Sequence, residues 1–134
     1  MQASQLSDEV QALKSKGVFK RLVKAVRYSY QGFSAAWQHE AAFRTEAVIF
    51  FAMCALVWFL PITHAQRGLL IGVGVVTLIV ELLNSAIEAV VDLASPDMHA
   101  LAGRAKDLGS AAVMLCLIST TIVWAYVLFD TFWH

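Results

Sequence analysis

Residues 69–91 read LLIGVGVVTLIVELLNSAIEAVV, a run that is apolar except at Glu81, Asn84, Ser85 and Glu88. Its 23 residues are enough for a helix that crosses the hydrocarbon core of a bilayer, which takes about 20. Polar side chains inside such a run are costly, so their presence has to be explained. We therefore predict a membrane-spanning helix that carries a functional or structural polar face.

Two further runs flank this segment. Residues 47–60 carry no charge, but they reach the length of a span only when the helix extends back toward residue 41 and on through residue 63. Residues 111–129 form a run of 19 without a charge. We predict an all-α membrane protein in which a single domain, residues 1–134, contains three transmembrane helices at about 41–63, 69–91 and 111–129.

The composition supports this class. The chain is 59% hydrophobic and 15% charged, whereas soluble domains are about 45–50% apolar and about 25% charged. High hydrophobicity excludes a disordered chain, and a net charge of zero argues against a nucleic-acid-binding protein. Cys54 and Cys116 lie in apolar runs without ligand-like spacing, which argues against a disulfide scaffold or a zinc site.

The basic residues predict the orientation in the membrane. Nine of the ten precede the first run or lie between the second and third, and only Arg67 lies in the turn at residues 61–68. Because Lys and Arg accumulate on the cytoplasmic side, the N-terminus is expected in the cytoplasm and the C-terminus on the extracytoplasmic side. No apolar stretch precedes residue 47, so no cleavable signal peptide is expected. The chain is thus expected to be a multi-pass membrane protein.

Residues 18–37 have a different pattern, with apolar side chains at spacings of three and four and basic side chains mostly off that face. This pattern is typical of an amphipathic helix lying in the membrane interface. Residues 1–16 are polar and are predicted to be frayed.

The polar residues of the second run share one helical face. Glu81, Asn84, Ser85, Glu88 and Asp92 follow one another at steps of three, one, three and four. A charge at mid-bilayer costs about 2.5–3.5 kcal/mol, and Ser or Asn would serve as well for packing alone. The pattern favours a functional stripe over buried packing contacts or snorkelling side chains.

A second acidic position precedes the first span. Glu40 and Arg44 are four residues apart and could form an ordinary surface ion pair. Glu40 and Glu88, however, both fall near the expected cytoplasmic boundary, where both could reach one cation. Mg²⁺ usually takes one or two protein carboxylates together with waters or phosphate oxygens.

The loop after the second run concentrates the remaining polar residues, from Ser95 to Asp107. Arg104 and Lys106 could be topology determinants or could neutralise a phosphate. No Gly-x4-Gly-Lys phosphate loop, kinase catalytic loop or nucleophile elbow occurs. The pair Gly72 and Gly74 lies within a span and indicates helix packing.

These stretches resemble a known family. Residues 81–92, ELLNSAIEAVVD, and 103–112, GRAKDLGSAA, closely resemble the signatures of the bacterial integral membrane diacylglycerol kinases. Residues 24–29, KAVRYS, and 35–44, AAWQHEAAFR, resemble the N-terminal half of the same family. The resemblance implies a homotrimer with active sites shared between chains, ATP and diacylglycerol as substrates, and Mg²⁺ as cofactor. It also implies a location in the bacterial inner (cytoplasmic) membrane, with the C-terminus in the periplasm.

The resemblance also implies roles for single residues. Glu81 would be the catalytic base, and Glu40 and Glu88 the metal-binding carboxylates. Met98 stands where the family usually has an aromatic residue, which removes one ring from the expected adenine contact. The positions that match nucleotide contacts are Arg21, Tyr28, Asp97, His99, Lys106 and Asp107. Those that match lipid-lining or supporting positions are Arg21, Ser29, Trp37, Glu46, Asn84 and Ser110.

Two other functions are compatible with the residues. A polyprenol kinase acting on undecaprenol would use the same layout with another lipid alcohol. A non-catalytic membrane assembly protein would use the polar stripe only to hold helices together. Mg²⁺-dependent phosphorylation of diacylglycerol would support a diacylglycerol kinase over these two alternatives.

Overall fold

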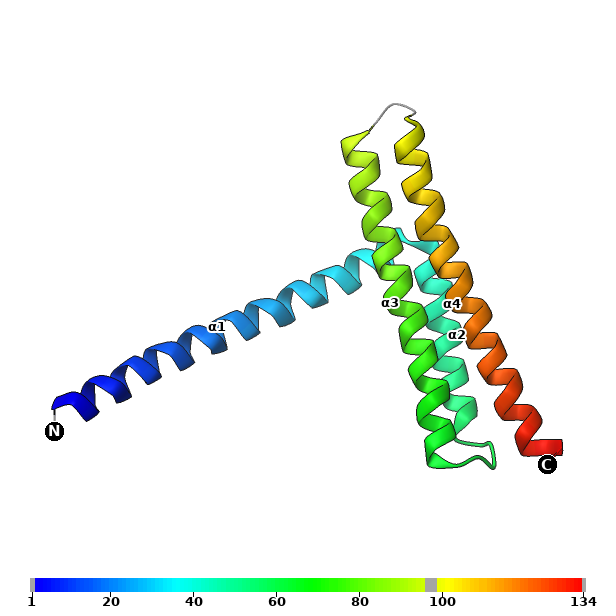
Figure 1. The fold of residues 1–134 in the computed structure, drawn as a ribbon, viewed down its shortest axis with the longest axis horizontal. Helices are drawn as coiled ribbons and strands as arrows, with labels where there is room; N and C mark the ends of the chain where they lie inside the picture. Colours follow the sequence, from blue (N-terminus) through cyan, green and yellow to red (C-terminus); the bar gives the residue numbers. More distant parts are fainter. Residues whose placement is uncertain (1, 96–98, 134) are drawn as a thin grey trace. The chain divides into compact units, whose positions relative to one another are not determined.

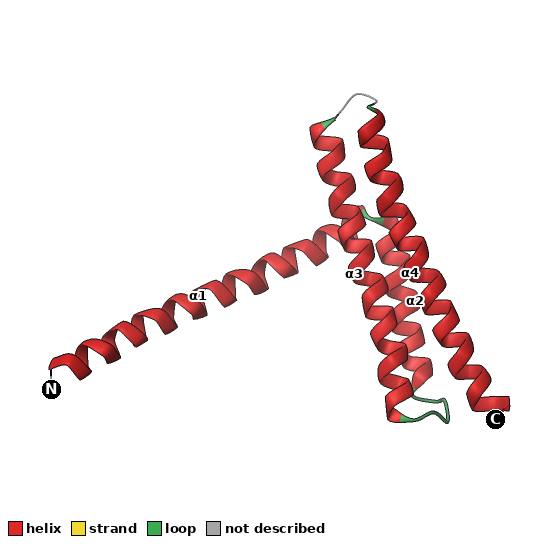
Figure 2. Ribbon diagram, in the orientation of Figure 1, coloured by secondary structure: helices red, strands yellow, loops and turns green. Residues whose placement is uncertain are grey.

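The chain folds into α-helices joined by short connections. The computed structural model describes residues 2–95 and 99–133, and no strand occurs within them (Figures 1 and 2). The helices are α1 (Gln2–His39), α2 (Ala41–Val57), α3 (His64–Ala94) and α4 (Ala100–Trp133). The prediction of an all-α chain is confirmed over these residues. Internal contacts divide the chain into two units, residues 1–38 and 39–134, which are described separately.

The first unit consists of α1. This helix contains the predicted amphipathic segment 18–37. It begins at Gln2, N-terminal to the predicted start of that segment. Gly32 lies inside the helix without interrupting it. The apolar side chains of Val23, Val26 and Phe33 are exposed, as expected for a helix whose apolar face contacts lipid.

The second unit begins with α2, which is short. It has 17 residues, or about 25 Å at about 1.5 Å per residue, against a hydrocarbon core of about 30 Å. The predicted span 41–63 is therefore helical only as far as Val57, after which Trp58–Leu60 turn toward α3. The α3 and α4 helices, in contrast, are both long and apolar enough to cross a membrane. The crossing of α2 stays a prediction.

The central helix of this unit is α3, which packs against both α2 and α4 (Figure 1). Thr63 and Gln66 form a capping box at its start: the Gln66 amide donates to Thr63 Oγ1 at 3.2 Å, and the Thr63 amide donates to Gln66 Oε1 at 2.9 Å. These bonds satisfy backbone donors that a helix start leaves without partners. The capping box thus sets the start of α3.

The turn between α2 and α3 is held by Arg67. Its Nε donates to the carbonyl oxygen of Val57 at 3.3 Å and its Nη2 to that of Leu60 at 3.1 Å. The guanidinium also lies 5.6 Å from the ring centroid of Trp58, within the range of a cation–π contact. Arg67 thus donates hydrogen bonds to carbonyl groups at and just after the end of α2, which have no partner within that helix.

Close helix contact explains one of the two span glycines. A Cβ at Gly74 would lie 2.6 Å from the Phe50 ring, whereas a Cβ at Gly72 would meet nothing within 4 Å. The packing role predicted for this pair is therefore confirmed for Gly74 and not for Gly72. A small apolar cluster of Val57, Ile62, Leu70 and Val127 closes the end of the unit near Arg67.

Candidate functional site

Four carboxylates line one cavity in the second unit. The cavity has a volume of about 230 Å³ and is bounded by the start of α2, one face of α3 and one face of α4. Its lining consists of Glu40, Ala42, Glu46, Glu81, Asn84, Ser85, Glu88, Ser110 and Val113. We call this space the acidic cavity.

The polar face of α3 supplies most of this lining. Glu81, Asn84, Ser85 and Glu88 all border the cavity, so the predicted alignment of the stripe is confirmed for four of its five residues. Asp92, one turn further on, is exposed and does not line it. Glu81 is the most buried carboxylate, with 4% of its surface exposed.

Glu40 reaches the cavity because the helical conformation is interrupted at this residue. Its φ of −106° and ψ of 108° are extended, and it is the N-cap of α2, where its carbonyl accepts from the Arg44 amide at 3.2 Å. The sequence prediction that Glu40 and Glu88 lie near one another is supported by their shared cavity. The predicted helices 18–37 and about 41–63 left residues 38–40 between them, and the structure narrows this gap to Glu40 alone.

Asn84 connects the residues of this face. Its Nδ2 donates to Glu88 Oε1 at 3.0 Å, one helical turn away. Two polar atoms of the lining, Asn84 Oδ1 and Glu46 Oε2, are buried and have no hydrogen-bond partner. Since buried polar atoms are nearly always paired, Glu46 Oε2 is a candidate to bind a hydroxyl, water or cation in the cavity. Asn84 Oδ1, in contrast, packs against Gly109 of α4.

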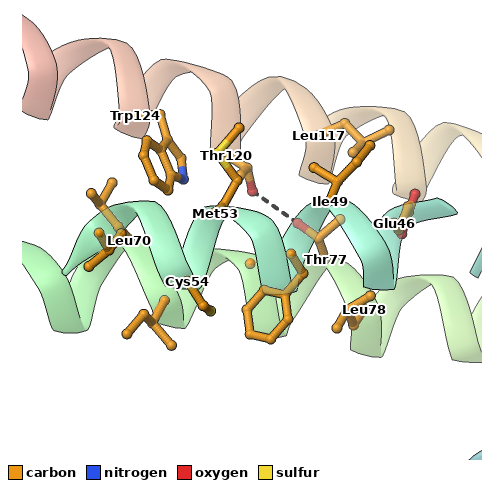
Figure 3. A pocket seen from close by; sticks show the side chains of 14 residues that line it. Glu46, Ile49, Met53, Cys54, Leu70, Thr77, Leu78, Leu117, Thr120 and Trp124 are labelled. Atoms are coloured by element: carbon orange, nitrogen blue, oxygen red, sulfur yellow. Dashed lines mark hydrogen bonds between the residues drawn. The ribbon is translucent and has the colours of Figure 1, made fainter. Parts of the chain in front are cut away.

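A second cavity in this unit is apolar, and Figure 3 shows the side chains that line it. It has a volume of about 100 Å³ and is lined by side chains of α2, α3 and α4, among them Phe50, Met53, Leu70 and Trp124. Glu46 lines both cavities. Glu46 therefore marks the boundary between an acidic space and a hydrocarbon-like space.

A polar contact between α3 and α4 lies within the apolar lining (Figure 3). The hydroxyls of Thr77 and Thr120 are 2.9 Å apart, and Thr77 also donates to the carbonyl oxygen of Val73 at 3.0 Å. Thr77 is buried and lies four residues before Glu81 on the same face of α3. The stripe predicted from Glu81 to Asp92 did not include Thr77, although the spacing of four residues from Glu81 indicates the same helical face.

Of the predicted nucleotide-contacting residues, His99, Lys106 and Asp107 do not line the acidic cavity. Lys106 Nζ forms an ion pair with Asp92 Oδ1 at 2.9 Å across the α3–α4 connection. His99 Nδ1 accepts from the Leu101 amide at 3.2 Å, and Asp107 is exposed. Asp97 lies outside the described residues. The other predicted positions, Arg21, Tyr28, Ser29 and Trp37, are exposed on α1, and their roles stay predictions.

The donor set suits a hard cation that takes few protein ligands. Among residues 2–95 and 99–133, no group of three or more metal-ligating side chains is gathered as a closed metal centre. Mg²⁺ commonly binds through one or two carboxylates and completes its shell with water or phosphate oxygens. Glu40 and Glu88 could supply those two carboxylates.

The fold and the site together define a helical membrane protein with an acidic site built into its apolar helices. Comparison with known proteins specifies the family. Residues 27–128 match the family described as prokaryotic diacylglycerol kinase, and the chain belongs to this family. The resemblance seen in the sequence signatures is thereby confirmed.

Individual relatives agree with the family assignment. The chain is 46% identical over 114 residues to a diacylglycerol kinase of Escherichia coli (strain K12), which covers 85% of this chain and 93% of that protein. It is 44% identical over 109 residues to a diacylglycerol kinase of Pseudomonas aeruginosa, covering 81% and 89%. A diacylglycerol kinase of Helicobacter pylori (strain J99) is 36% identical over 121 residues, covering 90% and 94%.

Proposed function

We propose that this protein is an ATP-dependent lipid kinase that transfers the γ-phosphate of ATP to the hydroxyl of diacylglycerol, giving phosphatidic acid. Family membership and the names of the relatives support this activity. The observation that carries the proposal is the acidic cavity. Four carboxylates from α2, from α3 and from Glu40, the residue before α2, line this cavity between otherwise apolar helices. Such costly placement is explained by chemistry on a polar group at the membrane surface.

Glu81 is the proposed catalytic base. It is nearly fully buried and lies seven residues before Glu88, or about 10 Å along the helix axis. A lipid hydroxyl entering from the membrane would meet Glu81 before it met the end of α3. The hydroxyl oxygen would attack the γ-phosphorus as the bond to the departing ADP breaks. The Glu81 carboxylate would accept the hydroxyl proton late in this loose transition state.

Glu40 and Glu88 are the proposed magnesium ligands. When bound, Mg²⁺ neutralises charge on the phosphate oxygens. The chain's own contribution is to hold the two carboxylates at one cavity, Glu40 through the break before α2 and Glu88 through the Asn84 amide. Asn84, Glu46 and Ser110 line the same cavity and would support the base or the lipid glycerol group.

The nucleotide would bind at the end of the unit near the α3–α4 connection. Lys106 is placed there beside Asp92 and would add positive charge to the phosphates. Arg21, Tyr28, Asp97, His99 and Asp107 are the further proposed nucleotide contacts, and Ser29 and Trp37 the further lipid contacts. Phosphoryl transfer depends mostly on such alignment and charge neutralisation.

The proposed setting is the bacterial inner membrane. In this arrangement α2, α3 and α4 cross the bilayer, the N-terminus is cytoplasmic and the C-terminus periplasmic. Large apolar side chains such as Phe51, Leu93 and Phe129 are exposed along these helices, which supports contact with lipid or with neighbouring chains. A homotrimer with shared active sites is part of the proposal on the strength of the family resemblance.

Transfer of labelled phosphate from ATP to lipid alcohols tests the function directly. The purified protein in detergent is expected to phosphorylate diacylglycerol in a Mg²⁺-dependent reaction. Undecaprenol in the same assay is the control substrate. Preferential labelling of undecaprenol would assign a polyprenol kinase, and no labelling of either lipid would favour a non-catalytic assembly protein.

A further inference from the structure

Gly109 on α4 lies against the polar face of α3. It is buried, and a Cβ built on it would overlap Asn84 Oδ1 and lie 3.3 Å from Asn84 Cγ. Gly103, six residues earlier on the same helix, would meet nothing within 4 Å. The absence of a side chain at position 109 is therefore required by a specific neighbour, and that neighbour is the Asn84 amide.

The steric restriction acts on the amide and leaves the helix backbone unaffected. The same Cβ would lie 3.9 Å from Asn84 Cα, an ordinary van der Waals contact. An alanine at position 109 could thus be accommodated with α3 and α4 at their present separation if the Asn84 side chain moved. The Asn84 amide donates to Glu88 Oε1 at 3.0 Å, so its movement would remove that hydrogen bond.

We propose that Gly109 is a positioning residue for the acidic cavity: its missing side chain lets the Asn84 amide hold the Glu88 carboxylate toward the cation. This inference rests on the proposed role of Glu88 as a metal ligand. Residues that orient a ligating carboxylate typically change metal affinity by about 10- to 100-fold when they are lost. Gly109→Ala is expected to weaken metal binding within that range.

Direct metal binding and thermal melting test the proposal. Binding of Mn²⁺, used as a spectroscopic substitute for Mg²⁺, is measured by electron paramagnetic resonance on the purified protein in detergent. Gly103→Ala is the matched control because both substitutions add the same intrinsic helix propensity. We expect Gly109→Ala to weaken Mn²⁺ binding at little cost in melting temperature, and Gly103→Ala to leave binding unchanged. Unchanged binding in Gly109→Ala would overturn the proposal.

A double-mutant cycle separates action through Asn84 from general packing. Asn84→Ala removes both the overlap and the hydrogen bond, so adding Gly109→Ala to it should weaken Mn²⁺ binding no further. Additive losses would contradict the proposed route. Glu88→Gln tests the premise: if it leaves binding unchanged, the metal role of Glu88 fails. If it weakens binding while Gly109→Ala does not, only the role of Gly109 fails.

Discussion

At the scale of single residues, the site depends on where a few carboxylates are placed. Glu81 is almost completely buried, while Glu88 is held by the Asn84 amide and Glu40 caps α2. The three side chains share a type but differ in surroundings, and this difference assigns them different proposed roles. Glu81 lies deepest along α3 and is the candidate to meet a hydroxyl of a membrane lipid.

Glu81→Gln removes the proposed base while keeping the shape and hydrogen-bonding capacity of the side chain. Because general-base catalysis typically contributes about 10²–10⁴-fold, kcat for diacylglycerol phosphorylation is expected to fall within that range. Binding of ATP and the melting temperature should change little. Initial-rate kinetics on purified protein provide the measurement. Ser119→Ala is the control, because the Ser119 hydroxyl is exposed and donates to the Leu115 carbonyl within α4. Near-normal kcat in Glu81→Gln would refute the assignment.

At the scale of elements, α3 organises the unit because it contacts both α2 and α4. Its capping box fixes where the helix starts, and the Thr77–Thr120 contact joins it to α4 one turn from Glu81. Hydroxyl pairs of this kind supply specificity in apolar surroundings, where hydrophobic attraction between helices is weak. The positions of Glu81 and Glu88 thus depend on how α3 packs against α4.

The contribution of the hydroxyl pair can be measured with a double-mutant cycle. Thr77→Val and Thr120→Val each remove one hydroxyl of the 2.9 Å contact. Coupling energies between such pairs average about 0.6 kcal/mol and reach about 1.7 kcal/mol, and we expect a value in this range from unfolding in mixed micelles. Thr121→Val is the control, since the Thr121 hydroxyl bonds only within α4, to the Leu117 carbonyl. Coupling near zero would show that the pair does not hold α3 to α4.

The ion pair between Asp92 and Lys106 makes a prediction about the α3–α4 connection. Both side chains are substantially exposed, so the pair is expected to contribute little to stability. If Lys106 exchanges Asp92 for a phosphate, Asp92→Asn should lower the half-saturating ATP concentration by a few-fold, and Lys106→Met should raise it. Steady-state kinetics at varied ATP test both variants. A higher ATP requirement in Asp92→Asn would mean that Asp92 itself is needed for nucleotide binding.

Much of this element-scale arrangement could be predicted because hydrophobic periodicity and charge placement are local properties. The helical segments and the shared face of Glu81, Asn84, Ser85 and Glu88 follow from spacing alone. The end of α2 at Val57 and the close contact of Gly109 with Asn84 do not, since they depend on the turn between α2 and α3 and on the separation of α3 and α4. The spacing of residues therefore did not predict the contacts between helices.

At the scale of the whole molecule, the net charge of zero is the sum of basic and acidic side chains that lie in different places. Nine of the ten basic residues fall on the predicted cytoplasmic side, whereas carboxylates line a cavity within apolar helices. Arg67, the remaining base, is engaged with the carbonyls of Val57 and Leu60 at the opposite end of the second unit. This separation predicts both the topology and the side from which ATP arrives.

Single cysteines can test this topology in intact cells with a membrane-impermeant maleimide. In a background with Cys54→Ala and Cys116→Ala, we place one cysteine at Lys20, His64 or Ala100, all of which are exposed. If α2, α3 and α4 all cross the membrane, only His64→Cys should react from outside, because the other two positions are cytoplasmic. Additional labelling of Lys20→Cys would mean that the 17-residue α2 does not span the bilayer. Labelling of Ala100→Cys alone would place the acidic end of α3 on the outer face, away from cytoplasmic ATP, and would contradict the proposed reaction.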